Sequence, residues 1–474
     1  MKKILACVSM IMLLLGTVLL AQWYQNPLIQ VSESSKEMNR KVNNWAKPDE
    51  EYLEYYELGT FETELPVLYI NTNGQSIQKE EKIWATMAVA EPLSDGQLRS
   101  VMSTPDYEAD IMINYRGASS YSGFDKKQYR VEFFREAGST NAKNYEFLGM
   151  GANSEWVLNG PFLDRTLLRN RLVYNLGREI FEWAPDNRYV ELFVNGEYQG
   201  VYLAVEPVTN GESRLRLADF GLSSGETAYI VKRDRVDTEE GALNVYGYYA
   251  GKTSNSLYID YPTTNNLTDV QKEWITKDIS NFEEVLYGDD FADTRNGYIK
   301  YLNVDNFVDY YILNEVVMNY DAGNLSTYVY KELGGKINIA IWDYNNCYDN
   351  YQWFAEDYCE FFLQDNAWFS RLLQDRAFVD KVVKRYKELR ADTLSEEYMY
   401  QQIESYRNEL GAATERNFAI WGYTFHDSFL SEDTELHVDP TSYEEAIELL
   451  KKSIHKRFLF LDEHITDLYE GCVN

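Results

Sequence analysis

The sequence predicts an α+β protein with a β-rich amino-terminal lobe, a mainly helical carboxy-terminal lobe and a membrane helix in front of both. Between residues 64 and 265, apolar residues alternate with period two between turn-forming segments, as in strands and hairpins. From residue 266 to 465 the apolar spacing becomes helical. Strands that are followed by helices, without regular alternation of the two, indicate an α+β architecture.

The first 24 residues predict a signal anchor. Two lysines precede an apolar stretch from residue 4 to 21, and Trp23 and Tyr24 follow it. This stretch is close to the roughly 20 residues of a membrane helix, and no convincing small-x-small cleavage site follows it. Lysines before the stretch and aromatic residues after it favour an amino terminus inside the cell. We therefore expect a single-pass membrane protein with its main domain outside the cytoplasm, or a secreted protein if the segment is cleaved.

Three segments are expected after the anchor. Residues 25–63 are polar and charged, which is typical of a stalk or linker. The main domain spans residues 64–465, with its lobes divided at residue 265, and residues 466–474 form a tail.

The composition narrows the classes of function. The 474 residues include 45 Lys and Arg against 76 Asp and Glu, so the net charge of −31 disfavours nucleic-acid binding. The four cysteines show neither a disulfide framework nor metal-ligand spacing, and Cys347, Cys359 and Cys472 can pair or stay reduced. The 39 Tyr and 10 Trp either fill a core, which is the default expectation, or line a sugar-binding surface.

The β-rich part contains a clear hairpin and several further strands. Asn195-Gly196 readily forms the tight turn of a hairpin, whose second strand leads to Glu206. Lys127 shares the parity of the apolar residues in 128–133, so we expect its side chain on the covered face of that strand. The predicted strands span residues 65–70, 111–115, 128–133, 189–194, 197–205 and 228–232.

Helical spacing marks one helix inside the β-rich part and the others after it. The first helix follows Asp164 and Thr166, either of which could cap its start. A hairpin with a Gly334-Gly335 turn joins residues 327–331 to 336–342. The predicted helices span residues 167–180, 270–286, 304–318, 368–389 and 443–464.

Asp321 and Asp343 are the candidate catalytic pair. Asp321 lies in the loop after helix 304–318, and Asp343 ends the second strand of the following hairpin. Because a hairpin brings its two ends together, we expect both carboxylates near one mouth of the sheet. Phosphoryl transfer needs one carboxylate to orient the proton of the nucleophile, another to hold magnesium, and a cation such as Lys127 or Arg116 for the phosphates. Capping or surface hydration is the alternative for either aspartate.

Several short segments occur in the order seen in a known family. They read RGASS (116–120), KKQYRV (126–131), LDRTLLRN (163–170), NGEYQGVY (195–202) and WDY (342–344). Together they resemble the CotH family of atypical protein kinases, over residues 65–464. The resemblance implies a diverged, two-lobed protein-kinase-like fold that uses ATP with Mg²⁺ or Mn²⁺. It also implies phosphorylation of Ser, Thr or Tyr in exported, coat or envelope proteins.

The resemblance implies a role for individual residues. Asp321 would be the catalytic base or the acid that orients the substrate, and Lys127 would meet the nucleotide phosphates. The metal would be held by Asp343, Asn324, Ser326 and Asn345. The nucleotide cleft would be lined by Arg116, Ser119, Ser120, Lys127, Glu206 and Lys232. The lobes would be braced by Asp164, Arg169 and Asn170.

Two departures from the family pattern affect the expected metal site. Relatives often have Trp-Asp-Tyr-Asp before a Phe-Gly pair, whereas this chain has the neutral Asn345 in place of the second acid. A His-Asn pair after the catalytic aspartate of some relatives aligns with Leu325 and Ser326, although Asn324 stands beside them. Amide and hydroxyl oxygens still coordinate magnesium, but each lost charge weakens the hold on a hard cation.

Three functions remain open. The first is an extracytoplasmic kinase, which requires ATP outside the cytoplasm. The second is a weak or inactive CotH-like scaffold of the cell envelope, and the third is a carbohydrate- or cell-wall-binding module that uses the aromatic surplus. Other classes lack their motifs, since the sequence contains neither a phosphate-binding glycine loop nor a nucleophile elbow, and its four histidines show no ligand spacing.

Overall fold

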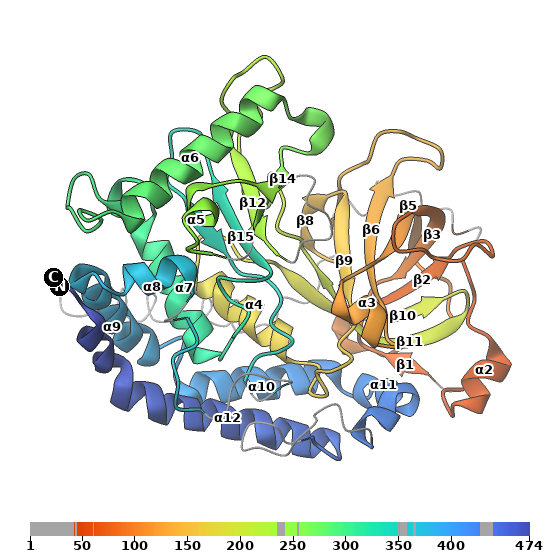
Figure 1. The fold of residues 1–474 in the computed structure, drawn as a ribbon. Helices are drawn as coiled ribbons and strands as arrows, with labels where there is room; N and C mark the ends of the chain where they lie inside the picture. The colour runs from red at the N-terminus through yellow and green to blue at the C-terminus, as the bar shows by residue number, and fades with distance from the viewer. Residues whose placement is uncertain are drawn as a thin grey trace, which may run out of the picture.

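The computed structural model describes residues 42, 45–59, 61–234, 242–253, 256–348, 350, 358–363, 366–426 and 439–474. Within these ranges, two main sheets lie side by side, and helices pack around them (Figure 1). Most strands precede residue 262, and most helices follow residue 268. The mixed α+β class that the sequence predicts is therefore confirmed.

A closed barrel forms the sheet nearer the amino terminus. Its neighbouring strands are antiparallel, except that β10 and β2 pair in parallel and close the barrel. The turn between β10 and β11 has φ of 52° at Asn195 and 89° at Gly196, as a tight hairpin turn requires. The strand order is β10 (Asn187–Val194), β11 (Glu197–Val205), β9 (Glu155–Asn159), β6 (Gln128–Phe134), β5 (Tyr107–Arg116), β3 (Ile83–Ala90) and β2 (Val67–Asn71).

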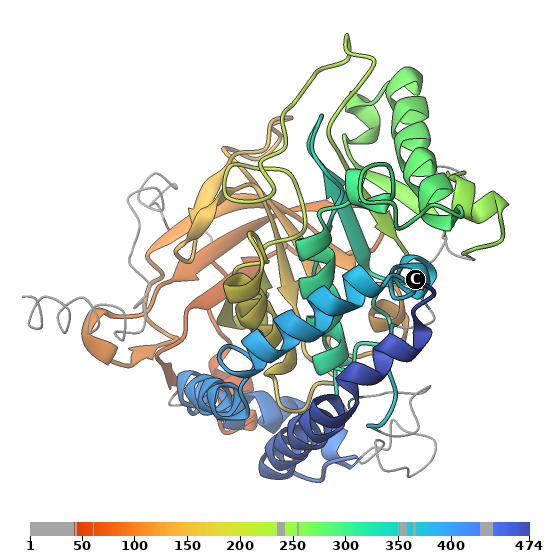
Figure 2. The same cartoon turned by 90° about the vertical axis from the view of Figure 1, so that its left-hand side faces the viewer.

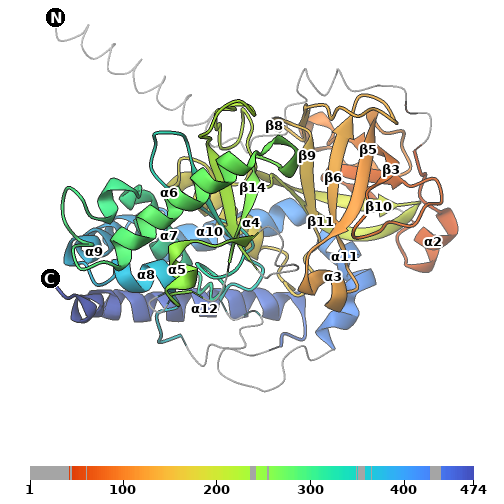
Figure 3. The same ribbon diagram turned by 45° about the horizontal axis from the view of Figure 1, so that its top comes forward.

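The second sheet contains five antiparallel strands within the described ranges. Helix α6 (Asp269–Tyr287) lies along one side of it (Figure 3). There, Asp278 accepts hydrogen bonds from the Tyr229 hydroxyl at 2.9 Å and from Lys331 Nζ at 2.7 Å. The strand order is β13 (Ala242–Leu243), β14 (Leu257–Tyr261), β12 (Tyr229–Arg233), β15 (Thr327–Lys331) and β16 (Asn338–Ala340).

Shorter strands and the remaining helices complete the fold. β1 (Glu62–Thr63) pairs with β4 (Arg99–Ser100), and β7 (Tyr145–Phe147) pairs with β8 (Met150–Asn153). The other helices are α2 (Glu50–Tyr55), α3 (Ser119–Gly123), α4 (Arg169–Ile180), α5 (Tyr246–Tyr249), α7 (Val304–Val316), α8 (Ala367–Leu372), α9 (Arg376–Arg390), α10 (Glu396–Leu410), α11 (Ala413–Trp421) and α12 (Tyr443–His464).

Part of the segment that we expected to form a stalk lies against the barrel. Residues 45–59 and 61–63 contain α2 and β1. Leu53, Leu58 and Phe61 are buried there in a cluster that also contains Tyr69 and Phe193 of the barrel strands. These apolar side chains pack the segment against the outside of the barrel.

The prediction of one helix over residues 368–389 is wrong, because α8 and α9 are separate helices. Asp375 separates them, since its carboxylate accepts the N–H of Ala377 at 3.0 Å and caps the start of α9. The Tyr298 hydroxyl donates to the same carboxylate at 2.7 Å. The other predicted helices correspond to α4, α6, α7 and α12, whereas α10 and α11 were not predicted.

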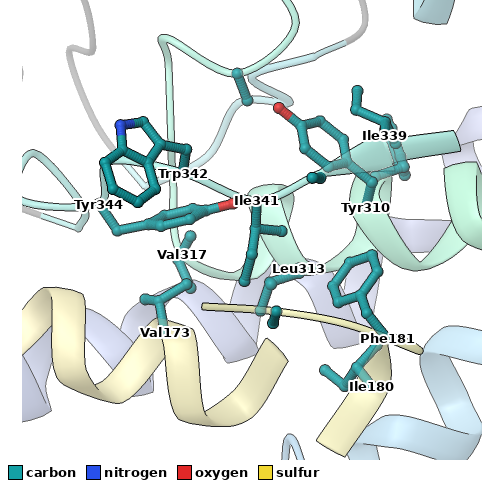
Figure 4. Packing of buried hydrophobic residues seen from close by; sticks show 14 of the residues in the cluster. Val173, Ile180, Phe181, Tyr310, Leu313, Val317, Ile339, Ile341, Trp342 and Tyr344 are labelled. Atoms are coloured by element: carbon teal, nitrogen blue, oxygen red, sulfur yellow. The ribbon is translucent and has the colours of Figure 1, made fainter. Parts of the chain in front are cut away.

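The largest core cluster includes α4, α7 and the chain that follows β16 (Figure 4). Val173 of α4 and Leu313 of α7 lie beside Ile341, Trp342 and Tyr344 in this cluster. The approach to α4 is close at Gly177, where a Cβ atom would lie 2.2 Å from the Cδ1 atom of Ile341. The chain on both sides of Asp343 is therefore buried against α4.

A buried ion pair joins α7 to α12. Arg457 Nη2 lies 2.8 Å from Glu315 Oε2, and both side chains are almost completely inaccessible. Arg457 also donates to the backbone oxygens of Glu315, Tyr358 and Glu360, while Glu315 accepts the N–H of Leu363. Figure 2 shows α9 crossing α7, so α7 is held by two helices from the carboxy-terminal part.

No helix within the ranges given above is long and apolar enough to cross a bilayer. The predicted anchor, residues 1–24, lies outside those ranges and stays a prediction. Cys347, Cys359 and Cys472 form no disulfide in the described part of the chain.

Replacing Arg457 with Met should destabilise the fold by about 3–5 kcal/mol, because Glu315 would remain buried without its cation. Urea denaturation measures this change in the free energy of unfolding. Lys381→Met is the matched control, since it breaks an exposed ion pair of 2.6 Å with Asp305 and should cost at most about 1 kcal/mol. Equal stability of the two variants would contradict the expected cost of the buried charge.

Candidate functional site

The loop that follows α7 carries Asp321. Asn319 builds this loop, because its Nδ2 donates to Asn314 Oδ1 at 2.9 Å and its Oδ1 accepts the Asp321 N–H at 3.2 Å. The carbonyl oxygen of Asp321 accepts the N–H groups of Asn324 at 3.0 Å and of Leu325 at 2.8 Å. The backbone of Asp321 is thus fixed from both sides.

Asp343 follows β16, and α4 holds its backbone. Its φ of 64° is a left-handed conformation that is uncommon for residues other than glycine. The Asp343 N–H donates to the Tyr174 hydroxyl at 3.2 Å, and the Tyr344 N–H donates to Asn170 Oδ1 at 2.7 Å. Asn170 and Tyr174 are one helical turn apart and lie on the same face of α4. Two side chains of one helix therefore fix the position of Asp343.

Asn346 connects the loop of Asp321 to the turn after Asp343. Its Nδ2 donates to Asp321 Oδ2 and to the Tyr320 hydroxyl, both at 3.2 Å. Burial raises the pKa of the Cys347 thiol well above its usual value, and the charges of Asp343 and Asp321 raise it further. The bond from Asn346 to Asp321 thus brings the turn after Asp343 against the loop of Asp321.

A buried ion pair braces the other side of this turn. Asp164 accepts hydrogen bonds from Arg169, at 2.6 Å from Nη1 and at 2.8 Å from the backbone N–H at the start of α4. Arg169 Nε then donates to the carbonyl oxygen of Cys347 at 3.0 Å. The Thr166 hydroxyl accepts the Leu168 N–H at 3.1 Å, so both predicted capping residues contact the beginning of α4.

Left-handed backbone is concentrated around this site. Five residues other than glycine have positive φ there, namely Leu167 (64°), Met318 (57°), Ser326 (48°), Asp343 (64°) and Tyr348 (59°). Such conformations cost of order 1–3 kcal/mol each and persist only where the surroundings hold them, which is common at active sites and ligand-binding sites.

Arg116 lies at the end of β5 and contacts the residue before Asp343. Its guanidinium lies over the Trp342 ring at 5.4 Å, and Nη1 donates to Gln128 Oε1 at 2.8 Å. Burial raises the pKa of the Tyr174 hydroxyl; the charge of Asp343 raises it further, and the charge of Arg116 lowers it. The barrel therefore supplies a cation that contacts the residue next to Asp343.

The prediction that Lys127 lies on the covered face is wrong, because the strand begins one residue later. Lys127 is half-buried, and its Nζ donates to the backbone oxygens of Tyr121 at 2.7 Å and Phe124 at 2.6 Å, at the end of α3. The fully buried lysine is Lys126, which donates to Asn417 Oδ1 at 2.7 Å. Burial lowers the pKa of Lys126 well below its usual value. Lys126 joins the barrel to α11.

Glu206 and Lys232 have different surroundings. Glu206 is buried 3.8 Å from Arg214 and accepts the Asp186 N–H at 3.0 Å, so its contacts lie within the barrel half and do not include Asp321 or Asp343. Lys232 lies on β12, with its Nζ 3.9 Å from Asp260. Its partner on the neighbouring strand β15 is Tyr328, whose ring lies 6.2 Å from the Trp342 ring that Arg116 covers. Lys232 thus borders the same region as Arg116.

The remaining predicted residues lie on segments next to these groups. Ser119 and Ser120 are the first residues of α3, just after Arg116. Asn324 donates to Asn366 Oδ1 from the loop of Asp321, which also contains Ser326. Asn345 Nδ2 donates to Asn346 Oδ1 at 2.8 Å. The candidate metal ligands therefore belong to the two loops that carry the aspartates.

Comparison with known proteins identifies the family of this chain. A model described as CotH kinase protein matches residues 113–461, which is more than half of the chain. The chain belongs to the CotH kinase family. A CotH relative, the inner spore coat protein H of Bacillus subtilis (strain 168), is 23% identical over 380 residues. The aligned region covers 79% of this chain and 92% of the relative.

Three of the five segments that resemble the CotH family lie around Asp343. RGASS contributes Arg116, LDRTLLRN contributes the bracing residues at the start of α4, and WDY contains Asp343 itself. NGEYQGVY instead forms the turn of the β10–β11 hairpin. The motifs therefore converge by folding, although they are spread over more than 200 residues.

Sequence reasoning missed several residues that position the site. Tyr174 accepts a hydrogen bond from the backbone N–H of Asp343, and Asn346 donates one to the carboxylate of Asp321. Asn159 Nδ2 donates to Gln128 Oε1 at 3.2 Å. The helical spacing of Asn170 and Tyr174 is a signal that could have marked a polar stripe on α4. The amides of β6 and β9 carry no comparable signal.

The oxygen donors at this site are compatible with magnesium. Magnesium is commonly held by one or two carboxylates together with waters and substrate phosphates. The two loops offer the carboxylates of Asp321 and Asp343 and the side-chain oxygens of Asn324, Ser326 and Asn345. Among the described residues, no three His, Cys, Asp or Glu side chains gather as a metal site. These donors thus suit a metal that is bound together with substrate phosphates better than a metal that is held by protein ligands alone.

The Glu206 carboxyl should make stability depend on pH. Burial raises its pKa from 4.5 to about 7, and burial also lowers the pKa of Arg214 to about 10, so both shifts show that desolvation outweighs their attraction. The folded state binds the proton more tightly than the unfolded state. The free energy of unfolding should therefore fall by about 3 kcal/mol as pH rises from about 4.5 to about 7.

Urea denaturation across this pH range measures that contribution. Glu206→Gln should lack it, whereas Glu197→Gln, at the exposed start of the strand β11 that leads to Glu206, should retain it. An identical pH dependence in Glu206→Gln and the parent protein would show that the carboxyl has an ordinary pKa.

Proposed function

We propose that this chain is an extracytoplasmic CotH-like protein kinase that transfers phosphate from ATP to Ser, Thr or Tyr of exported, coat or envelope proteins. Membership of the CotH kinase family supports the enzyme class, and the name of the Bacillus subtilis relative supports a spore-coat setting. The observation that carries the proposal is the common site of Asp321 and Asp343, linked through Asn346, with Arg116 beside it. In this reading, the barrel and the mainly helical part are the two lobes of a diverged kinase-like fold.

Asp321 would act as the catalytic base. The oxygen of a substrate hydroxyl attacks the γ-phosphorus of ATP, the bond from this phosphorus to the β–γ bridging oxygen breaks, and ADP leaves. The hydroxyl proton passes to the Asp321 carboxylate. Asn346 donates to Asp321 Oδ2 at 3.2 Å, which orients the carboxylate for this role.

Asp343, Asn324, Ser326 and Asn345 would hold Mg²⁺ or Mn²⁺, which neutralises phosphate charge when bound. Arg116 is the best-placed cation of the barrel for the phosphates, with Ser119, Ser120 and Lys232 nearby. Lys127 donates two of its three ammonium hydrogens to backbone oxygens, so one hydrogen remains to bond a phosphate. The contacts of Glu206 do not support a role in the nucleotide cleft.

A weak or inactive CotH scaffold is the second candidate, and Asn345 is the observation that favours it. The neutral amide replaces an acid of active relatives and removes one charge from the metal ligands. A carbohydrate-binding module has less support, because most of the described Tyr and Trp side chains are either buried in the core clusters or packed against them.

The location of the domain rests on the amino-terminal segment. We propose that residues 1–24 anchor the domain at the outer face of the membrane, because their apolar stretch and flanking residues fit a signal anchor. Protease accessibility of the main domain on intact cells would test this, and protection of the domain would overturn it.

Asp321→Asn and Asp343→Asn should each lower the rate of phosphate transfer by about 100-fold or more, because each removes a carboxylate from the proposed reaction. The assay incubates the exported fragment with labelled ATP, manganese and a coat-protein substrate. Asp305→Asn, an exposed position on α7, is the control and should keep the parent rate. Equal labelling by all four proteins, or by none, would sink the kinase proposal.

Asn345→Asp should tighten Mn²⁺ binding by about tenfold or more, because a second carboxylate attracts a divalent cation more strongly than an amide does. Calorimetric titration measures the affinity, and the labelling assay shows whether activity follows. Unchanged Mn²⁺ affinity would mean that residue 345 does not face the metal. Tighter binding without any activity would favour the scaffold.

A further inference from the structure

A row of side-chain amides connects the barrel to the backbone beside Asp343. Arg116 Nη1 donates to Gln128 Oε1 at 2.8 Å, and Asn159 Nδ2 donates to the same oxygen at 3.2 Å. Asn170 Nδ2 donates to Asn159 Oδ1 at 3.3 Å, and the Tyr344 N–H donates to Asn170 Oδ1 at 2.7 Å. We call the side chains of Gln128, Asn159 and Asn170 the amide relay.

The part of the amide relay nearest Asp343 is buried. Gln128 begins β6, Asn159 ends β9 and Asn170 lies in the first turn of α4. Asn159 and Asn170 are only 8% and 6% exposed, so a broken bond here is poorly replaced by water and costs more than at the surface. Each of these two amides accepts at its oxygen and donates from its nitrogen. Arg116 Nη1 and Asn159 Nδ2 share Gln128 Oε1 as their acceptor, so a weaker bond from Arg116 leaves this oxygen more available to Asn159. That change reaches Asn170 and the Tyr344 N–H through the two bonds that follow.

A second contact links Arg116 to the other side of Asp343. The guanidinium lies over the Trp342 ring at 5.4 Å, and the Tyr174 ring lies 5.9 Å from that same ring. The Tyr174 hydroxyl accepts the Asp343 N–H. Arg116 is thus connected to the residues before and after Asp343, through the Trp342 and Tyr174 rings on one side and through the amide relay on the other.

We propose that the amide relay couples the phosphate-binding and metal-binding ends of the site, with Gln128, Asn159 and Asn170 as positioning residues. The inference rests on the proposed kinase function. Any change in the bond from Arg116 to Gln128, as when a phosphate engages the guanidinium, alters the relay and hence the backbone that presents the Asp343 carboxylate. Two ligands that depend on one shared element affect each other reciprocally.

Asn159→Leu cuts the amide relay at its centre without changing any charge. Mn²⁺ affinity, measured by calorimetry without nucleotide, should fall about 10- to 100-fold, as is typical when an outer partner of a metal ligand is lost. Amide hydrogen exchange at Tyr344 should accelerate in the same variant. The control is Asn175→Leu, which removes hydrogen bonds to Tyr406 and Asn187 from the same helix and should change neither readout.

Gln128→Met cuts the amide relay at the Arg116 end and tests transmission, since this half-buried position is more tolerant of change. Faster exchange at Tyr344 and weaker Mn²⁺ binding, in a variant with the parent melting temperature, support the relay. If the parent protein binds Mn²⁺ and both relay variants bind it equally well, with unchanged exchange at Tyr344, the relay is overturned while the kinase proposal stands.

A parent protein that binds no Mn²⁺ gives a different outcome. The metal-dependent function then fails, and so does the coupling of two ligands, whereas exchange at Tyr344 still shows whether the amide relay holds the backbone. The two measurements therefore separate failure of the relay from failure of the proposed function.

Discussion

The buried pair of Glu315 and Arg457 is the interaction on which the arrangement around the site depends. It joins α12 to the end of α7, which leads into the loop of Asp321, and it also binds the segment 358–363. Burial raises the pKa of the Glu315 carboxyl and lowers that of the Arg457 guanidinium, so each charge is costly where it lies. The pair persists because backbone groups satisfy the bonds that remain on both side chains.

The site is assembled from parts of the chain that belong to different sheets. The barrel supplies Arg116, the loop after α7 supplies Asp321, and α4 holds the backbone of Asp343. Helix α4 follows the barrel strand β9 in sequence, yet it packs against α7 and the chain after β16 (Figure 4). This packing is possible because Gly177 has no Cβ atom, which would collide with Ile341. Helix α4 thereby fixes the position of Asp343, in the second half of the chain, relative to the barrel in the first half.

The elements that the sequence predicts correctly are those whose signals are local. The Asn-Gly turn, the period-two strands and the apolar stripe of α12 need no partner to be recognised. Predictions fail where a distant contact decides. Asp375 divides a predicted helix with the help of a hydroxyl from far along the chain, and the strand parity that pointed to Lys127 does not continue past the start of β6, so Lys126 is buried instead. Hairpin geometry explains why the loop of Asp321 meets the turn after Asp343, but the amide relay joins three elements that only the fold brings together.

The pairing of α7 with α12 also determines when the site can form. Arg457 follows Glu315 by 142 residues, so at a synthesis rate of roughly 5–20 residues per second the carboxylate waits about 7–28 s for its cation. Until then, α7 and the loop after it lack the contact that fixes them, while the barrel strands have already emerged. Contacts between such distant residues are also slow to form, because closing a long loop costs entropy before the contact is made. The site is therefore a late product of biosynthesis, completed only after the chain has extended well beyond both aspartates.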